Sequence, residues 1–296
     1  MRSSDGLPTV AIVGRPNVGK STLINRVVGQ KVAIVTHKPQ TTRNRITAIA
    51  NTETAQIVFI DTPGIHKPRH EMDRLMVETA VSSLKQVDIV LLMIDVTQAF
   101  GRGDQHVLEL MRKVDVPLLL VINKVDQVAK EIILPLIDEY QSRGRFNEIV
   151  PISALKGDNV DRLVEVLETY LPEGPPLFPE DALTDLPERF FAAEMIREKI
   201  LIHVHEEVPY STAVRVETWE DCDGMTRVEA SILVERDSQK GILLGQGGRM
   251  IKRIGTEARK ELESFLNTRV YLGLFVKVRE RWRENRRLLN ELGIGD

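Results

Sequence analysis

Residues that could bind phosphate stand near the start of the chain. Residues 14–21 read G-x-x-x-x-G-K-S, with the apolar run 10–13 before them and helical apolar spacing over 22–28 after them. Such glycines let backbone N–H groups surround a phosphate, and the helix N-terminus adds its positive end. Lys20 would face the β- and γ-phosphates, and the Ser21 hydroxyl would bind Mg²⁺. A glycine turn that binds nothing is the alternative, which the flanking strand and helix disfavour.

A second phosphate motif, Asp61-Thr62-Pro63-Gly64, ends the short apolar run 56–60, which we expect to pair with residues 46–50. Asp61 can hold Mg²⁺ directly or through water, and the Gly64 N–H can reach the γ-phosphate. The polar segment 31–44 lies between the two motifs. It is either a plain surface loop or a switch whose threonine reaches Mg²⁺. Thr42 is our candidate for that hydroxyl, and Thr41 is the alternative.

The motif that would select the base is Asn123-Lys124-Val125-Asp126, directly after the apolar run 116–122. The Asp126 carboxylate can accept two hydrogen bonds from guanine N1–H and N2–H₂, whereas adenine offers no such donor pair. Asn123 can tie this loop to the phosphate loop, and the Lys124 stem can lie over the base. The backbone of Ser153-Ala154-Leu155 follows another apolar run and can contact the guanine O6.

These motifs, in this order, resemble the translation-factor-type small GTPases over about residues 8–171. The resemblance implies a P-loop GTPase domain with a doubly wound, mostly parallel sheet, with helices near 73–86, 103–113, 134–143 and 158–170. Residues expected to contact GTP or GDP are Gly14, Arg15, Pro16, Asn17, Val18, Gly19, Lys20, Ser21, Thr22, Asp61, Thr62, Pro63, Gly64, Asn123, Lys124, Val125, Asp126, Ser153, Ala154 and Leu155. For hydrolysis and its Mg²⁺ we select Lys20, Ser21, Thr42, Asp61 and Gly64.

One position departs from the pattern of Ras-like proteins. Ile65 stands where they carry a water-orienting glutamine, and an aliphatic group cannot position a nucleophilic water. We therefore predict slow intrinsic hydrolysis that a partner or a monovalent cation accelerates. Potassium-using relatives employ the residue at Asn17 as a cation ligand, which makes Asn17 a candidate K⁺ ligand. The alternative is that Asn17 makes only a hydrogen bond within its loop.

Composition describes an ordinary water-soluble chain with an uneven charge distribution. The 296 residues suffice for two domains, and the single cysteine, Cys222, allows no internal disulfide and suits a reducing cytosol. We see no signal peptide and no apolar run near the roughly 20 residues of a membrane-spanning helix. Residues 179–235 hold 5 basic and 14 acidic side chains, whereas residues 236–296 hold 14 and 8. This asymmetry favours an anionic partner at the C-terminal end or a merely solvated surface.

A second domain is predicted after a proline-rich connection. Residues 171–181 cannot sustain a helix or a central strand, so we place domains at 1–171 and 188–296 and an extended linker at 172–187. Pro187 should precede a helix over 188–201. Residues 213–219 and 226–234 alternate like the strands of a hairpin, and 270–278 supplies a third strand.

Between these strands, Gly245-Gln246-Gly247-Gly248 joins a short helix to an amphipathic helix that ends near Phe265. Helix–G-x-x-G–helix is how a KH domain holds single-stranded RNA, and the predicted order of elements is that of a smaller α+β, type II KH domain. A glycine-rich turn in a protein-interaction module is the alternative. The residues that we assign to RNA are Lys240, Gly245, Gln246, Gly247, Gly248, Arg249, Lys252 and Arg253.

The segment 279–288 is expected to form a basic C-terminal helix that either extends the RNA surface or caps the domain. We expect Trp282 to pack on the domain rather than to stack on a base. Residues 178–181, 189–190 and 196–199, the switch sequence 39–43 and the two domains together resemble the bacterial Era family essentially end to end.

That resemblance implies a cytoplasmic GTPase that binds GTP or GDP with Mg²⁺. It also implies binding near the 3′ end of 16S ribosomal RNA, a role in maturation of the small (30S) ribosomal subunit and loose association with the inner face of the cell membrane. We expect a monomer. Two other functions stay open: a GTPase of tRNA modification, and an RNA-binding scaffold whose nucleotide site is only structural. Phosphate release would separate the scaffold from the enzyme.

Overall fold

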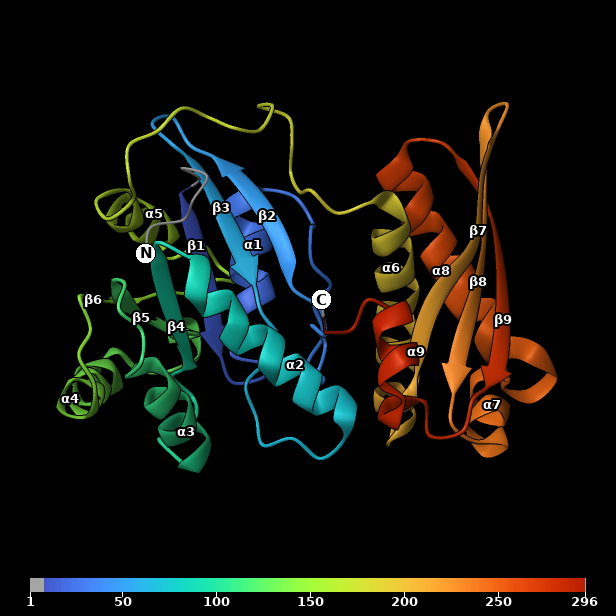
Figure 1. Ribbon diagram of the computed structural model, residues 1–296, viewed down its shortest axis with the longest axis horizontal. Coiled ribbons are helices and arrows are strands. Elements are labelled where there is room, and N and C mark those ends of the chain that lie inside the picture. The colour runs from blue at the N-terminus through green and yellow to red at the C-terminus, as the bar shows by residue number, and fades with distance from the viewer. Residues whose placement is uncertain (1–7, 296) are drawn as a thin grey trace. The chain divides into compact units, whose positions relative to one another are not determined.

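The computed structural model describes residues 8–295, which form two compact units (Figure 1). Their main boundary along the chain lies between Asp185 and Leu186. Among residues 8–295, none of the helices combines the length and the apolar character that a bilayer crossing requires.

The first unit is built on a six-stranded sheet. Its strands are β1 (Thr9–Gly14), β2 (Ile46–Asn51), β3 (Gln56–Asp61), β4 (Ile89–Asp95), β5 (Leu118–Asn123) and β6 (Glu148–Pro151). Their order is β2-β3-β1-β4-β5-β6, in which β2 is antiparallel to β3 and every other pair is parallel. Strands β1, β3 and β5 are buried along their whole length, because helices cover both faces. The predicted mostly parallel α/β sheet is confirmed.

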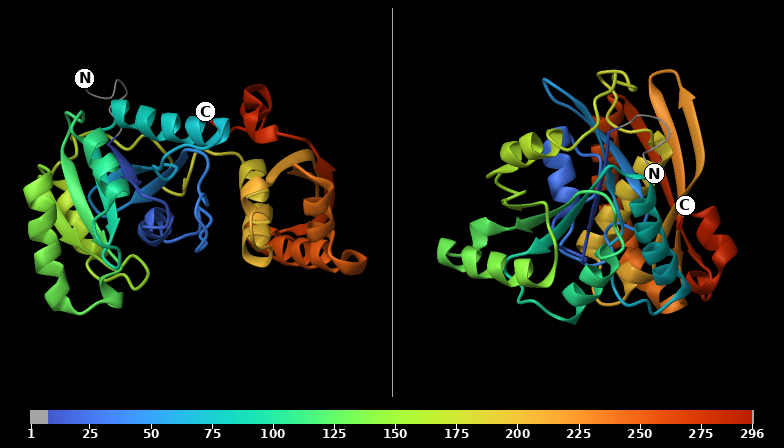
Figure 2. Two further views of the ribbon diagram at one scale, coloured as in Figure 1. Left: turned by 90° about the horizontal axis from the view of Figure 1, so that it is seen from below. Right: turned by 60° about the vertical axis from the view of Figure 1, so that its left-hand side comes forward.

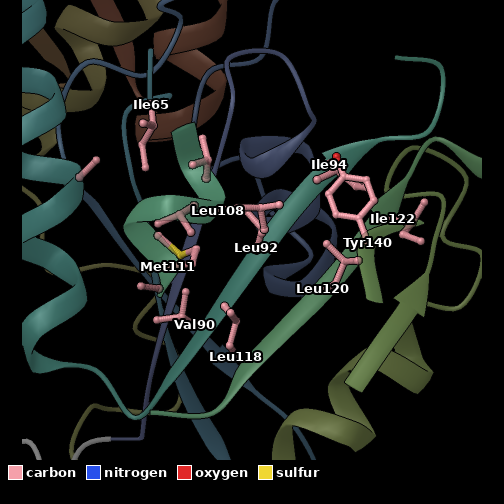
Figure 3. Packing of buried hydrophobic residues seen from close by; sticks show 14 of the residues in the cluster. Ile65, Val90, Leu92, Ile94, Leu108, Met111, Leu118, Leu120, Ile122 and Tyr140 are labelled. Carbon is pink, nitrogen blue, oxygen red and sulfur yellow. The ribbon is translucent and has the colours of Figure 1, made fainter. Parts of the chain in front are cut away.

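Helices lie on both sides of this sheet. They are α1 (Lys20–Val28), α2 (Glu71–Ser82), α3 (Arg102–Met111), α4 (Ile133–Arg143) and α5 (Val160–Glu168), with 3-10 turns η1 (Ser83–Gln86), η2 (Val125–Gln127) and η3 (Lys130–Ile132). Figure 1 shows α2 in front of the sheet and α1 behind it. Apolar side chains of α3 and of strands β4 and β5 form one buried cluster, which includes Leu92, Leu108 and Leu120 (Figure 3).

Part of the expected linker is bonded to the edge strand β2. The Ile49 N–H donates to the Leu183 carbonyl over 2.8 Å, and the Thr184 hydroxyl donates to the Thr47 carbonyl over 2.6 Å. Beside β2, the Gln56 amide oxygen accepts from the backbone N–H groups of residues 177 and 178. Residues 177–184 therefore cover the open edge of β2, which would otherwise present unpaired backbone groups.

The second unit has helices on one side of a three-stranded sheet. Its elements are α6 (Glu188–His203), η4 (Val208–Ser211), β7 (Ala213–Cys222), β8 (Met225–Val234), α7 (Asp237–Leu244), η5 (Gln246–Gly248), α8 (Arg249–Leu266) and β9 (Arg269–Val278). In the order β7-β8-β9, β7 is antiparallel and β9 parallel to β8. Ile196 of α6, Ile232 of β8 and Ile254 of α8 are fully buried in one core. The predicted helix–strand–strand–helix–helix–strand order is confirmed.

The prediction of a continuous C-terminal helix over residues 279–288 is wrong. The segment instead forms a 3-10 turn, η6 (Trp282–Glu284), and a short helix, α9 (Arg286–Glu291). Asn285 has extended rather than helical dihedral angles and caps α9 by accepting a hydrogen bond from Leu288 N. The Trp282 side chain is fully buried, and its indole N–H donates to the Ser211 carbonyl over 2.9 Å. Burying this large side chain outweighs helical continuity. The expected packing of Trp282 is confirmed.

Candidate nucleotide and RNA sites

Four strands of the first sheet end at one edge, three of them in a polar residue and one in a glycine. Gly14, Asp61, Asp95 and Asn123 are the last residues of β1, β3, β4 and β5. The carboxyl ends of parallel strands are where open α/β sheets bind ligands. A cavity of about 620 Å³ opens at this edge.

The cavity gathers most of the residues that the sequence predicted for the nucleotide. Its predicted lining residues are Arg15, Pro16, Asn17, Val18, Gly19, Lys20, Ser21, Thr22, Thr42, Gly64, Asn123, Lys124, Asp126 and Leu155. The predicted residues Gly14, Asp61, Thr62, Pro63, Val125, Ser153 and Ala154 do not line it. Asp61 and Ala154 bond to side chains that do.

Lys20 and Asp61 are two oppositely charged side chains that are buried beside the phosphate loop. Lys20 is 6% exposed and Asp61 is 0% exposed. Burial lowers the pKa of Lys20, and the Asp61 carboxylate partly opposes that effect. Burial raises the pKa of Asp61, which Lys20 and the hydroxyls of Ser21 and Thr42 oppose. Charges held this far from water interact strongly with a phosphate or a cation that enters the cavity.

The donors around Asp61 fit a Mg²⁺ ion. The Ser21 hydroxyl donates to Asp61 Oδ2 over 2.6 Å, and the Thr42 hydroxyl lies 2.9 Å from Ser21 Oγ and 3.3 Å from Asp61 Oδ2. Asp61 Oδ1 is buried without a hydrogen-bond partner, which is costly for a carboxylate oxygen. Mg²⁺ is a hard cation that takes oxygen ligands and retains several waters, so it would satisfy this set.

Geometry distinguishes the two candidate threonines of the segment 31–44. The Thr41 hydroxyl donates to the Lys38 carbonyl over 2.7 Å and lies 2.7 Å from the Thr36 hydroxyl. It is thus engaged within its own segment. Only the Thr42 hydroxyl of this pair lies beside Ser21 and Asp61.

Asn123 joins three loops at the base-recognition end. Its amide N–H donates to the Val18 carbonyl over 2.7 Å, and its amide oxygen accepts from the Ala154 N–H over 2.9 Å. A Cβ on Gly19 would lie 2.2 Å from Asn123 Nδ2, so only glycine allows this approach. The side chain is buried, which makes both bonds structurally important.

Lys124 and Asp126 occupy the same end of the cavity. The Lys124 ammonium bonds to the Asp95 carboxylate over 2.6 Å, which holds the lysine stem along the cavity wall. Asp126 is exposed and lines the cavity, as a carboxylate that meets a base from outside should be. Sequence reasoning missed Asp95, although it directly follows the apolar strand run, as Asp61 and Asn123 do. It also missed Asp104, which bonds to Arg15 over 2.9 Å.

Ile65 and His66, the first two residues after the second phosphate motif, lie in different environments. Ile65 is 1% exposed and packs in the apolar cluster (Figure 3). His66 Nδ1 donates to the Gly64 carbonyl over 2.8 Å, and His66 Nε2 lies 3.7 Å from the Asp73 carboxylate. Gln40 donates to the same carboxylate over 2.9 Å. This polar cluster links the segment 31–44 to the one that follows Gly64.

Asn17 is bonded to the segment 31–44 rather than within its own loop. Its amide N–H donates to the His37 carbonyl over 2.8 Å, and its backbone is left-handed, with φ of 64°. The amide oxygen is the atom that a monovalent cation would use.

The predicted RNA loop of the second unit has three glycines, and Gln246 is its one residue with a side chain, which accepts from Arg249 over 2.9 Å. Gly245, Gly247 and Gly248 have φ of 67°, 61° and 76°. A Cβ on Gly247 or Gly248 would meet nothing within 4 Å, so this face of the loop is free for a sugar-phosphate backbone. Arg249, Lys252 and Arg253 are exposed at the start of α8, and Lys240 is half-buried on α7.

Comparison with known proteins decides the family. A family of GTPases described as 50S ribosome-binding matches residues 9–124, and the KH domain family matches residues 207–283. The GTPase Era of Geotalea uraniireducens is 54% identical over 96% of both chains, and that of Geobacter metallireducens is 52% identical over the same shares. The chain belongs to the Era GTPase family. The predicted GTPase activity and the predicted pairing of GTPase and KH domains are confirmed.

Solved Era structures match along nearly the whole chain. An Aquifex aeolicus Era variant bound to GDP·AlF₄⁻ is 43% identical, with a TM-score of 0.94, and covers 98% of this chain and 100% of its own. An Era complex with MgGDPNP and nucleotides 1506–1542 of 16S ribosomal RNA is 43% identical, with a TM-score of 0.95, and covers 98% and 99%. This Era-family chain therefore has the family's fold in both units.

Proposed function

We propose that this Era-family GTPase is a GTP-controlled protein that binds the 3′ region of 16S ribosomal RNA during maturation of the small subunit. The observation that carries the proposal is the meeting of three functions in one cavity. Lys20 serves the phosphates, the Ser21–Thr42–Asp61 group serves Mg²⁺, and Asn123 positions the base-recognition loops. The related complex with MgGDPNP and 16S RNA supports the same ligands here.

The chain's own residues account for most steps of hydrolysis. Backbone N–H groups of residues 14–21 and the Lys20 ammonium hold the β- and γ-phosphates, and the Gly64 N–H orients the γ-phosphate. Ser21, Thr42 and Asp61 would hold Mg²⁺, which neutralises charge that develops on the phosphates when it is bound. Because Ile65 is buried in the core, no side chain of that position orients the attacking water. The slow intrinsic rate remains a prediction.

Potassium is a second ligand that this site would use. Asn17 lines the cavity and its Nδ2 is bonded to the His37 carbonyl, so its Oδ1 would supply an oxygen to K⁺ at the phosphate edge. Phosphate release measured in K⁺ and in Na⁺ tests the idea, with Asn17→Ala as the paired variant. Equal rates in the two salts would exclude a cation role for Asn17.

The nucleotide state would reach the RNA-binding unit through β2 and the segment bonded to it. Thr42 lies a short distance before β2 in the chain, and residues 177–184 are bonded to β2 and to Gln56. A change at Thr42 on loss of the γ-phosphate would therefore act on β2, the strand to which the segment that leads to the second unit is hydrogen-bonded. The predicted result is a different RNA affinity with GDP and with a non-hydrolysable GTP analogue.

The decisive experiment measures both ligands on the full chain. Calorimetry should show GTP binding with Mg²⁺ and no comparable ATP binding, and RNA affinity should depend on the nucleotide. Gln56→Ala should reduce that dependence while GTP affinity stays unchanged, because Gln56 contacts residues 177 and 178 but does not line the cavity. ATP bound as tightly as GTP would refute the proposed specificity.

A further inference from the structure

The outward face of β9 carries a regular series of basic, aromatic and small residues. Alternate residues of this strand are Arg269, Tyr271, Gly273, Phe275 and Lys277. Their neighbours Val270, Leu272, Leu274 and Val276 point to the other face, where they pack on the core of the second unit. Strand residues two apart share a face, so the five lie in one row. The strand has no acidic residue.

Two large aromatic side chains in this row are exposed to solvent. Tyr271 is 51% exposed and Phe275 is 52% exposed. Helices α6 and α8 lie on the opposite face of the sheet, and this face turns away from them (Figure 1, Figure 2). Exposed aromatic side chains that gather on one face mark an interaction site more often than isolated apolar residues do.

Gly273 brings the two rings over one gap. A Cβ on Gly273 would lie 3.6 Å from Phe275 Cε2 and 3.7 Å from Tyr271 Cε1. Both ring edges therefore lean toward the position that lacks a side chain. On β8, Arg227 pairs in register with Tyr271, and its guanidinium lies 5.6 Å from the ring centroid. The result is a surface of two rings and a guanidinium around Gly273, and Glu229 of β8 borders the same position, with its Cγ 3.4 Å from the added Cβ.

We propose that Tyr271, Gly273, Phe275 and Arg227, the outer aromatic patch, bind unpaired bases of RNA that continues out of the G-x-x-G loop. Aromatic rings stack on every base, a guanidinium plane adds a cation, and basic residues at both ends of the row meet the phosphates. This inference rests on the proposed RNA-binding function and adds a second contact region to it.

The position of β9 favours RNA over a protein as the occupant. In the order β7-β8-β9 it is an edge strand, and its inner face packs on α8, the helix that begins at the G-x-x-G loop. A Cβ on Gly255 of α8 would lie 3.3 Å from Leu274 of β9, which shows how closely the two elements approach. A strand of RNA that leaves the loop would pass this edge to reach the patch. The row's two cationic ends also suit a polyanion.

Acidic neighbours shape the patch without cancelling it. Glu229 pairs with Arg227 over 2.6 Å, and Glu217 bonds to Lys277 over 3.1 Å. Both pairs are solvent-exposed, where ion pairs contribute little and side chains exchange partners easily. Phosphates that approach Arg227 or Lys277 therefore compete for them at small cost, and the aromatic rings stay uncovered.

The test compares short and long single-stranded RNA on the full chain. We would use labelled oligoribonucleotides without secondary structure, of about 6 and about 20 nucleotides, since a single binding groove covers only a few nucleotides. Wild-type protein should bind the long RNA about ten-fold or more tightly than the short one, because two stacked bases add to the loop contacts. The double variant Tyr271→Ala, Phe275→Ala should lose that gain and bind the short RNA normally.

Gly273→Val provides the sharper variant. The added Cβ has only ordinary contacts of 3.4 Å or longer, and valine favours strands, so the fold should be kept. The side chain nevertheless fills the gap between the rings and should abolish the length-dependent gain. Ile202→Ala is the matched control, because Ile202 is 46% exposed on α6, and it should leave both affinities unchanged.

The outcomes separate this inference from the proposed function. If Gly273→Val and the double variant bind long RNA like wild type, the patch does not hold RNA and the inference is wrong. Loss of a protein partner in that case would identify the patch as a protein interface, which also overturns it. If wild-type protein binds neither RNA, the proposed RNA-binding function itself fails.

Discussion

Asn123→Ala should weaken the whole nucleotide site although Asn123 need not touch the substrate's reacting atoms. The substitution removes a hydrogen bond of 2.7 Å to the Val18 carbonyl and one of 2.9 Å from the Ala154 N–H, both buried. Each of the two partners left unsatisfied costs about 1–3 kcal/mol, so the first unit should lose about 2–6 kcal/mol of its free energy of unfolding. Bound GDP must then reorder both loops, and we expect its affinity to fall about ten-fold or more.

The two units can be followed separately in this experiment. Both tryptophans, Trp219 and Trp282, lie in the second unit, so tryptophan fluorescence reports its unfolding. A fluorescent GDP analogue reports on the first unit, and far-UV circular dichroism, which reports on both units, gives the first-unit transition once the tryptophan transition is known. Asn123→Ala should shift the first-unit transition to lower denaturant concentration and leave the tryptophan transition in place.

A matched asparagine serves as the control. Asn147 also accepts a backbone hydrogen bond, from Leu118 N over 3.0 Å, but it is exposed and lies outside the cavity lining. Asn147→Ala should cost about 1 kcal/mol at most and leave GDP affinity unchanged. If Asn123→Ala retains wild-type stability and wild-type GDP affinity, the argument that this side chain joins the three loops is wrong.

Three further predictions concern single side chains. Ile65→Gln should not accelerate GTP hydrolysis, because the side chain at this position points into the core. The buried amide should instead lower the first unit's free energy of unfolding by about 1–3 kcal/mol. A stopped phosphate assay that shows faster turnover would contradict this. Bonding to Asp73 raises the pKa of His66 above its ordinary 6.5, against the effect of burial. The stability that protonated His66 contributes is therefore complete below about pH 6.5 and is lost as the pH rises through the folded-state pKa. Denaturation at several pH values should show this loss in wild type and not in His66→Gln. Trp282→Phe should cost the second unit about 1–3 kcal/mol, since it leaves the buried Ser211 carbonyl unsatisfied, which chemical denaturation followed by circular dichroism would measure.

Much of the nucleotide site could be predicted because its motifs are local. Each motif directly follows a strand, and the backbone of such a loop is set by the glycines and by the strand and helix around it. Parallel strands bring their carboxyl ends to one edge, so Gly14, Asp61 and Asn123 had to meet once the strands were recognised. The glycine loop between α7 and α8 could also be predicted, because its backbone is set by its own glycines and by the helices on either side of it.

Contacts between distant segments could not be read in this way. The choice of Thr42 over Thr41 depends on how the segment 31–44 folds over the phosphate loop, and the bond from Lys124 to Asp95 depends on β4 and β5 being neighbours. The bonding of residues 177–184 to β2 depends on β2 being the sheet's edge. Periodicity records which face of an element is apolar, and it does not record which elements are adjacent.

The sequence by itself determined the chemistry of this protein: a phosphate loop, a carboxylate for Mg²⁺, a guanine-selective loop and a glycine loop for RNA, each written in a few consecutive residues. Only the tertiary structure decided that Trp282 is buried and that the basic segment around it is not one continuous helix. It also decided that Tyr271 and Phe275 lean toward Gly273 on an exposed face. The reason is physical. Local motifs depend on backbone conformation within one loop, whereas burial and exposure depend on which surfaces the other elements cover.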